Sequence, residues 1–381
     1  MAASVALWSG ATVVSGTSSS YEMLLLSRIA LGAVIAAAGP ALASLTGDFF
    51  PAGERARIFG YILIGELVGT AVGFMVSGAV AAALGWRAAF WVLSVPGFAL
   101  AWVLLRRLPE PARGGQGRPE TDEPAACDGE RMGLWSAIRY ALGVRTNLLL
   151  IVASSLGYFF LSGVRTFAVV FVRADYGLSQ ATATLALSTL VVGALAGVLV
   201  GSRLPDRLLA RGHPSARIIV AAIALIAAAA IFVPALVLPW LAAALPLYAL
   251  GSAALSAANP PLDAARLDVI NFQFWGRAEG VRTTLRTLAI ATAPLLFGVL
   301  ADQLGGSLPE DAGGPQAIPA SAGQGLAETF LIMLIPLAIG GLILLRARRT
   351  YPRDARAAAA EPPDVIERTN RNRRDVGTVS V

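Results

Sequence analysis

Three of the ionisable side chains within long apolar stretches of the sequence stand out, namely Arg28, Glu66 and Arg165. A charge within hydrocarbon costs about 3 kcal/mol or more, so such groups usually face a cavity or a partner. Counting along a helix places Glu66 ~13 Å and Arg28 ~10 Å from the nearer end of their stretches. Glu66 is interpreted either as a carboxylate that takes up a proton or faces a cationic substrate, or as half of a structural ion pair with Arg282 or Arg286.

Other side chains are candidates for contact with a substrate. Arg165 either extends to the nearer membrane surface or contacts an anionic substrate. Tyr158, Phe159 and Trp91 are aromatic residues on apolar stretches. They line a site for an amphipathic molecule, or they face lipid or the protein core.

A stripe of glycines and a cluster of charges indicate helix contacts. Gly65, Gly69 and Gly73 recur every four residues, which places them on one helix face where another helix can approach closely. Charged residues follow the Asn259-Pro260-Pro261 sequence, a predicted helix end or hinge, and recur in the range 277–286. We expect these charges to form pairs between helices that hold the cytoplasmic side closed.

The scarcity of metal-binding residues narrows the chemistry. The chain contains one histidine, His213, and one cysteine, Cys127. Histidine-rich metal sites, cysteine-based zinc clusters and internal disulfides are therefore excluded, and we expect no metal and no cofactor. All 30 basic residues are arginine, so a phosphate-binding glycine loop with lysine is also excluded.

The elements that must position these residues are apolar segments. The 381 residues are 56% hydrophobic and 14% charged, with a mean hydropathy of +0.67, which is typical of a chain that crosses a bilayer repeatedly. Each segment is near the ~20 residues needed to span the hydrocarbon core as a helix. The segments are 3–19, 21–47, 57–84, 88–106, 147–172, 180–203, 216–236, 239–260, 280–303 and 326–346. We therefore predict an all-α integral membrane protein.

The charges in the loops predict the orientation. Nearly all loop arginines fall on one side of the predicted membrane, and the other side holds only Arg87 and Arg173. Positive charge favours the cytoplasmic side. The prediction is a multi-pass monomer in the cell membrane, with the linker and C-terminal tail in the cytoplasm, a bilayer as partner and no nucleic acid.

A polar stretch divides the chain into unequal parts. We expect a bundle of four helices at 1–106, a cytoplasmic linker at 107–146, a bundle of six helices at 147–346 and a basic tail at 347–381. Residues also match at a constant offset of 220, including Pro40 with Pro260, Asp48 with Asp268 and Gly60 with Gly280. Under this duplication, two helices of a six-plus-six plan would precede Met1; a natural ten-helix protein is the alternative.

This plan and several motifs resemble the major facilitator superfamily, with the drug-exporter and spinster-like branches most similar. The residues that carry the resemblance are Arg28-Ile-Ala-Leu-Gly32, Gly39-Pro40, Asp48-Phe-Phe-Pro51, the glycines of segment 57–84, Gly85-Trp86-Arg87 with Phe90, and Gly201 with Asp206-Arg207. The resemblance implies that Arg28 corresponds to an arginine of the family's fourth helix that pairs with an acidic group on the first helix in proton-coupled members; anchoring or packing is the alternative. Glu66, Arg282 and Arg286 are candidates for proton coupling or gating from the residues themselves. The resemblance also implies that Gly201, Asp206 and Arg207 form a loop motif.

The chain departs from the family pattern in two places. Ser202 occupies the usual glycine position of the loop motif, and no proline follows Gly69 or Gly73 where the antiporter signature has one. The resemblance implies a secondary transporter that moves a small organic solute by alternating access, with proton-coupled export. The alternatives are a transport-incompetent remnant and a membrane-embedded enzyme, and the latter lacks a recognisable catalytic constellation.

Overall fold

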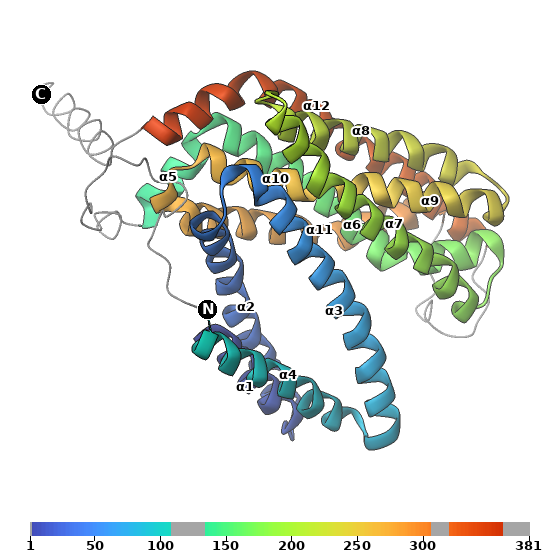
Figure 1. Cartoon of the computed structure of the whole chain (residues 1–381). Coiled ribbons are helices and arrows are strands. Elements are labelled where there is room, and N and C mark those ends of the chain that lie inside the picture. Colours follow the sequence, from blue (N-terminus) through green and yellow to red (C-terminus); the bar gives the residue numbers. More distant parts are fainter. Residues whose placement is uncertain (1, 108–133, 306–319, 361–381) are drawn as a thin grey trace, which may run out of the picture.

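The computed structural model describes residues 2–107, 134–305 and 320–360, and the regular structure in these ranges is helical (Figure 1). The helices are α1 (Ala2–Gly16), α2 (Tyr21–Phe49), η1 (Ala52–Glu54), α3 (Arg55–Leu84), α4 (Trp86–Arg107), α5 (Leu134–Gly143), α6 (Arg145–Tyr176), α7 (Gln180–Ala210), α8 (Ala216–Val237), α9 (Leu241–Ala257), α10 (Asn259–Val269), η3 (Phe272–Phe274), α11 (Trp275–Gly305) and α12 (Ala320–Ala360). Cys127, most of the expected linker and the end of the tail lie outside the described residues.

Nine described helices are long and apolar enough to cross a membrane, with α9 and α10 counted together. This confirms the predicted all-α membrane class. The first expected span, 3–19, is shorter in the structure than a full membrane crossing. Its helix α1 has 15 residues, which is about 22 Å at helical rise.

Local signals set several helix ends. The Ser20 and Ser179 hydroxyl groups accept hydrogen bonds from the backbone amides of Met23 and Thr182, and so begin α2 and α7. Gly85 and Gly177 end α3 and α6 with φ of 88° and 65°, a conformation that favours glycine.

The helices extend beyond the expected segments in three places. Residues 134–143 of the expected linker form α5. Pro205 does not end α7, which continues to Ala210. The last helix continues from the expected boundary at 346 to Ala360. Polar and basic residues are compatible with a helix where the chain leaves the membrane. A prediction from hydropathy alone therefore places the ends of these helices too early.

The expected duplication is visible in the helix bounds. Adding 220 to the bounds of α2, η1 and α3 gives 241–269, 272–274 and 275–304. The structure has α9 with α10 at 241–269, η3 at 272–274 and α11 at 275–305. Pro260 and Pro261 lie in the first turn of α10, so the proline pair marks a short break at Ala258 rather than the end of the span.

The chain forms two groups of helices that meet near one end (Figure 1). Helices α1–α4 make the N-terminal half, and α6–α12 make the C-terminal half with most of the buried core. Contacts between the halves join α3 to α7 and α10, and α2 to α11. We call this the contact end: it contains the α2–α3 connection (Phe50–Arg55) and the α10–α11 connection (Asp268–Trp275).

Small residues allow close helix contact at a site that the sequence did not single out. A Cβ atom added to Gly193, Gly197 or Gly201 of α7 would lie about 2 Å from a backbone carbonyl oxygen of α9. The closest of these distances is 1.9 Å, between Gly197 and Ala253. The backbones of α7 and α9 therefore touch, as in other small-residue contacts between membrane helices.

The glycine stripe predicted for helix packing lies elsewhere in this arrangement. A Cβ atom on Gly65, Gly69 or Gly73 would meet no other described atom within 4 Å. These glycines lie in the middle of α3, the helix that diverges from the C-terminal half beyond the contact end (Figure 1). Their packing role thus remains a proposal for a conformation in which that part of α3 meets another helix.

Candidate functional site

A cavity of about 270 Å³ lies between the two halves. Its walls come from α3 of the N-terminal half and from α6, α7, α8, α9 and the start of α10. Most of the lining is leucine, valine and alanine, and the polar exceptions are Glu66, Tyr158, Arg165, Ser252, Ser256 and Asn259. An apolar site with a few convergent polar groups is typical of a small-molecule site.

The structure brings together three of the residues singled out in the sequence. Glu66 on α3 faces the cavity together with Tyr158 and Arg165, which lie seven positions apart on α6. Neither Glu66 nor Arg165 forms an ion pair with a residue that the structure describes. The cavity therefore holds two opposite charges without direct partners.

The predicted partners of Glu66 are engaged elsewhere. The Arg282 guanidinium binds the Glu279 carboxylate three positions earlier on α11. The Arg286 guanidinium lies over the Tyr158 ring, 4.6 Å from its centroid, a favourable contact for a cation. Arg286 is within electrostatic range of Glu66 but forms no direct pair with it.

Arg282 belongs to a buried network within the C-terminal half. The Arg266 guanidinium binds Asp263 and lies 2.8 Å from the Glu279 carboxylate, and Arg282 contacts the same two acids. The four groups neutralise one another, which is the condition under which charges are tolerated in a membrane interior. The expected pairs between helices thus exist: Arg266 and Arg282 join α10 to α11 within one half, whereas Asp268 of the same cluster pairs with Arg55 of α3 in the other half.

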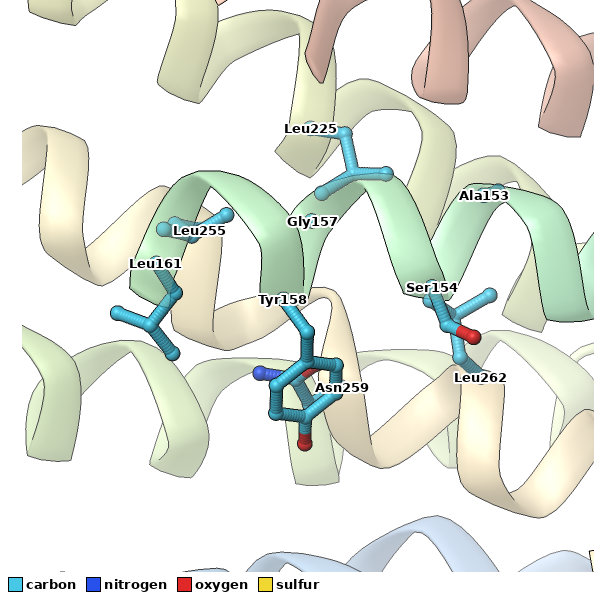
Figure 2. A pocket seen from close by; sticks show the side chains of 9 residues that line it. All are labelled: Ala153, Ser154, Gly157, Tyr158, Leu161, Leu225, Leu255, Asn259 and Leu262. Atoms are coloured by element: carbon cyan, nitrogen blue, oxygen red, sulfur yellow. The ribbon is translucent and has the colours of Figure 1, made fainter. Parts of the chain in front are cut away.

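Tyr158 lies where the main cavity meets a smaller one. Figure 2 shows Tyr158 and Asn259 in the small pocket, together with Ser154 and apolar residues. The volume of this pocket, about 10 Å³, suits about one water molecule. Polar groups from α6 and α10 therefore face the inner end of the main cavity.

An aromatic side pocket of about 30 Å³ adjoins the main cavity. The two share Val164, Ala168, Leu187, Leu190 and Phe232. The side pocket adds apolar and aromatic walls from Phe160, Phe171, Leu236, Tyr248 and Phe330. It can accommodate a compact apolar group of a bound molecule.

A second ionic cluster joins the halves at the contact end. Asp268 of α10 binds Arg217 of α8 and Arg55 of α3, and the Tyr351 hydroxyl group donates to it at 2.5 Å. Arg217 is 1% exposed and also pairs with Asp206 at 3.2 Å. A hydrogen bond from a side chain to the backbone also joins the two halves, because the Arg217 guanidinium donates to the Ala52 carbonyl oxygen.

The predicted loop motif lies on the last turns of α7 at this cluster. The Asp206 carboxylate accepts a hydrogen bond of 3.1 Å from the Arg57 backbone amide in the first turn of α3. A carboxylate is favourable at a helix N-terminus because it complements the helix dipole. Gly201 contacts α9, and Arg207 is exposed and forms no ion pair in the part of the chain that the structure describes.

Shape complements charge at the contact end. A Cβ atom on Gly47 of α2 would lie 1.9 Å from the Trp275 ring, so only glycine leaves room for this indole. The Arg55 guanidinium lies 4.9 Å from the centroid of the same ring. On α3, Gly60 leaves room for Ser202 of α7, since an added Cβ would lie 2.3 Å from the serine Cβ.

Three candidates lie away from the cavity. The Arg28 guanidinium lies over the Phe90 ring at 4.5 Å, within the N-terminal half. Trp91 packs against Gly16, and Phe159 packs against Phe297. Among the described residues that line the main cavity, neither aromatic residue is present.

Arg55, Arg217 and Tyr351 were not predicted as site residues. In the sequence they stand at helix ends among many other arginines, where solvent exposure is the usual environment. The offset of 220 gave one usable signal for Arg55. It pairs Arg55 with Trp275, and both positions are close in sequence to the matched residues Asp48 and Asp268.

Comparisons with known proteins agree on the fold. A sequence model of the Major Facilitator Superfamily matches residues 1–270. The structure is similar to a bacterial homologue of the human lysosomal transporter Spinster in an inward-facing, unoccupied conformation, with a TM-score of 0.59 and 19% identity over 93% of this chain and 83% of that one.

Two further solved structures are similar. The transporter FucP in its outward conformation gives a TM-score of 0.64 with 13% identity, over 91% of this chain and 82% of FucP. The human organic anion transporter MFSD10 (TETRAN) gives 0.59 with 18% identity, over 88% of this chain and 76% of that one.

Proposed function

The chain belongs to the major facilitator superfamily, and from this premise we propose that it is a proton-coupled exporter of a small organic solute. Members of this family carry solutes across membranes by alternating access to a site between two halves. The cavity between α3 and the C-terminal half is in the position that such a site requires. The observation that carries the proton-coupling proposal is Glu66, a carboxylate without an ion-pair partner among the described residues, on the wall of this cavity.

The conformation of the chain suggests how access alternates. The halves are joined at the contact end by Arg55, Asp268, Arg217 and Asp206, and α3 diverges from the C-terminal half beyond it. We place the contact end in the cytoplasm, because the arginine-rich connections lie on that side of the predicted membrane. The cavity is then closed to the cytoplasm in this conformation, and breaking the inter-half contacts opens it there.

Glu66 links protons to this motion in the proposed cycle. Apolar surroundings favour the neutral carboxyl group, whereas a nearby cation favours the carboxylate. Arg286 is such a cation in this conformation, and rocking of α3 changes its distance from Glu66. Proton uptake from outside and proton release to the cytoplasm therefore accompany solute export in this cycle. One chain supplies both halves of the proposed transporter.

A flux measurement tests this function. The purified chain is reconstituted into liposomes with a trapped pH dye, and ethidium, octanoate and 8-aminooctanoate are supplied in turn as cationic, anionic and zwitterionic probes. We expect at least one probe to move protons in the direction opposite to its own flux. Transport of a probe with no accompanying proton movement would refute the coupling, and cotransport in the same direction would refute export.

A further inference from the structure

We propose that the cavity recognises a zwitterionic amphipathic molecule, with its cationic group at Glu66 and its anionic group at Arg165. This inference rests on the proposed function, because it names the class of solute for the same cavity. It goes further in assigning opposite charges of one ligand to two named side chains and in fixing the ligand's direction.

The first support is the charge of the lining. Glu66 and Arg165 are the charged residues among those described as lining the cavity, and neither has an ion-pair partner in the described chain. Buried charges of the C-terminal half, such as Arg266 with Glu279, are paired directly, whereas Glu66 and Arg165 are exposed at the cavity. A ligand that carries both charges compensates both groups at once, whereas a single charge leaves one of them uncompensated in an apolar site.

The second support is the separation of the two charges. Glu66 is close enough to Tyr158 to interact with it electrostatically, and both line the cavity. Arg165 follows Tyr158 by seven positions on α6, which is two helical turns or ~10 Å. Glu66 and Arg165 do not pair with each other, so a ligand whose two charges are separated by a spacer can contact both groups.

The third support is the wall between the charges. Leu161 and Val164 of α6 and Leu187, Leu190 and Val191 of α7 line this region. The aromatic side pocket opens from the same stretch, through Val164 and Phe232. An apolar spacer suits these walls, because burial of its methylene groups away from water is favourable.

The arrangement also relates the ligand to protons. The charged and titratable groups near Glu66 are Tyr158 and Arg165 of α6 and Arg286 of α11. A ligand cation and a proton compensate the same carboxylate, so they compete. Binding of the zwitterion should therefore weaken as the pH falls, whereas binding of a simple anion at Arg165 should be maintained or strengthened when Glu66 takes up a proton.

A binding experiment distinguishes these possibilities. The full chain in lipid nanodiscs is titrated with 8-aminooctanoate, octanoate or octylammonium, with empty nanodiscs as the blank. The three probes share one chain length, and the two charged ends of 8-aminooctanoate are separated by an apolar spacer. We expect 8-aminooctanoate to bind about tenfold more tightly than either singly charged probe, as one added charged contact provides.

Matched variants assign the two ends. Glu66→Gln should reduce the affinity for 8-aminooctanoate about tenfold, reduce its pH dependence and maintain or strengthen octanoate binding. Arg165→Gln should reduce the affinities for 8-aminooctanoate and octanoate alike. Glu328→Gln and Arg203→Gln change exposed residues outside the cavity and should alter none of these affinities.

Two results would overturn the proposal. One is octanoate or octylammonium binding as tightly as 8-aminooctanoate, and the other is failure of 8-aminooctanoate to bind the unmodified chain. The assay contains no gradient, so it separates this inference from the proposed function. Zwitterion binding without proton-coupled flux would support the proposed ligand class and refute the coupling. Proton-coupled flux of a probe with a different charge would support the coupling and refute the ligand class.

Discussion

Arg55, the first residue of α3, lies 3.3 Å from the Asp268 carboxylate near the end of α10, so one ion pair joins the two halves across 213 positions of sequence. Asp268 also binds Arg217, which is nearly inaccessible to solvent. The same carboxylate therefore stabilises the C-terminal half and connects it to the N-terminal half. The two roles are separable, because Arg55 takes part only in the contact between halves and in local bonds to Gly47 and Phe50.

Arg55→Gln should favour opening of the contact end. The variant loses one charged contact between halves while Arg217 retains Asp268, and a loss of about 1–2 kcal/mol shifts a two-state population about 5–30-fold. Spin labels at Leu84→Cys and Trp240→Cys, both exposed and far from the contact end, report the change in a Cys127→Ser background. We expect a new population at shorter distance, and an unchanged distribution would show that Arg55 does not hold the halves together.

Asp268→Asn should destabilise the whole chain. The change leaves Arg217, at 1% exposure, with Asp206 as its remaining carboxylate partner among the described residues. Removing one member of a buried pair costs about 3–5 kcal/mol. Thermal unfolding in detergent should occur at a clearly lower temperature than for the unmodified chain, with Glu328→Gln as the control. Equal unfolding temperatures would contradict the buried pair.

Gly197→Ala should be far more damaging than Gly69→Ala. The new methyl group at Gly197 would lie 1.9 Å from the Ala253 carbonyl oxygen, and α7 and α9 must separate to admit it. Overpacking of this kind costs about 1–3 kcal/mol. Gly69 has open space around it, so its substitution should change stability by less than about 0.5 kcal/mol. A comparable loss in both variants, measured by thermal unfolding, would contradict the assigned helix contact.

These variants also show how far the sequence determined the site. The hydropathy pattern predicted the membrane helices, and the offset of 220 predicted that α3 and α11 are counterparts. Neither signal reports which helix faces touch. The glycines at 65, 69 and 73 and those at 193, 197 and 201 have the same spacing, yet only the second set contacts another helix in this conformation.

The chemistry of single residues was predictable to a similar extent. A charge in an apolar segment identified Glu66 and Arg165, because burial is costly wherever the helix lies. The partner of each charge depends on the rotation and crossing of helices. For this reason Arg282 binds Glu279 rather than Glu66, and Arg217 at a helix end is buried among three elements.

The proposed orientation predicts which tryptophan positions are accessible from outside the cell. Trp135 of α5 is 77% exposed and Trp240 between α8 and α9 is 76% exposed. The helix α5 and the α8–α9 connection lie at opposite ends of the C-terminal half (Figure 1). In a Cys127→Ser background, an impermeant thiol reagent should modify Trp240→Cys in intact cells and Trp135→Cys only after permeabilisation. The reverse pattern would invert the topology and place the contact end outside.

The last prediction concerns the coupling role of Glu66. Glu66→Gln keeps the size and much of the hydrogen-bonding capacity of the side chain but cannot ionise, so the step that links proton binding to motion is lost. In proteoliposomes, the variant should fail to accumulate solute in response to a pH difference, while solute exchange at equal pH on both sides persists at solute concentrations that offset the weaker binding. Preserved exchange is the internal control, because it requires a folded chain and both access states. If the variant still accumulates solute when only a pH difference is applied, another group carries the proton, and Glu66 serves the solute alone.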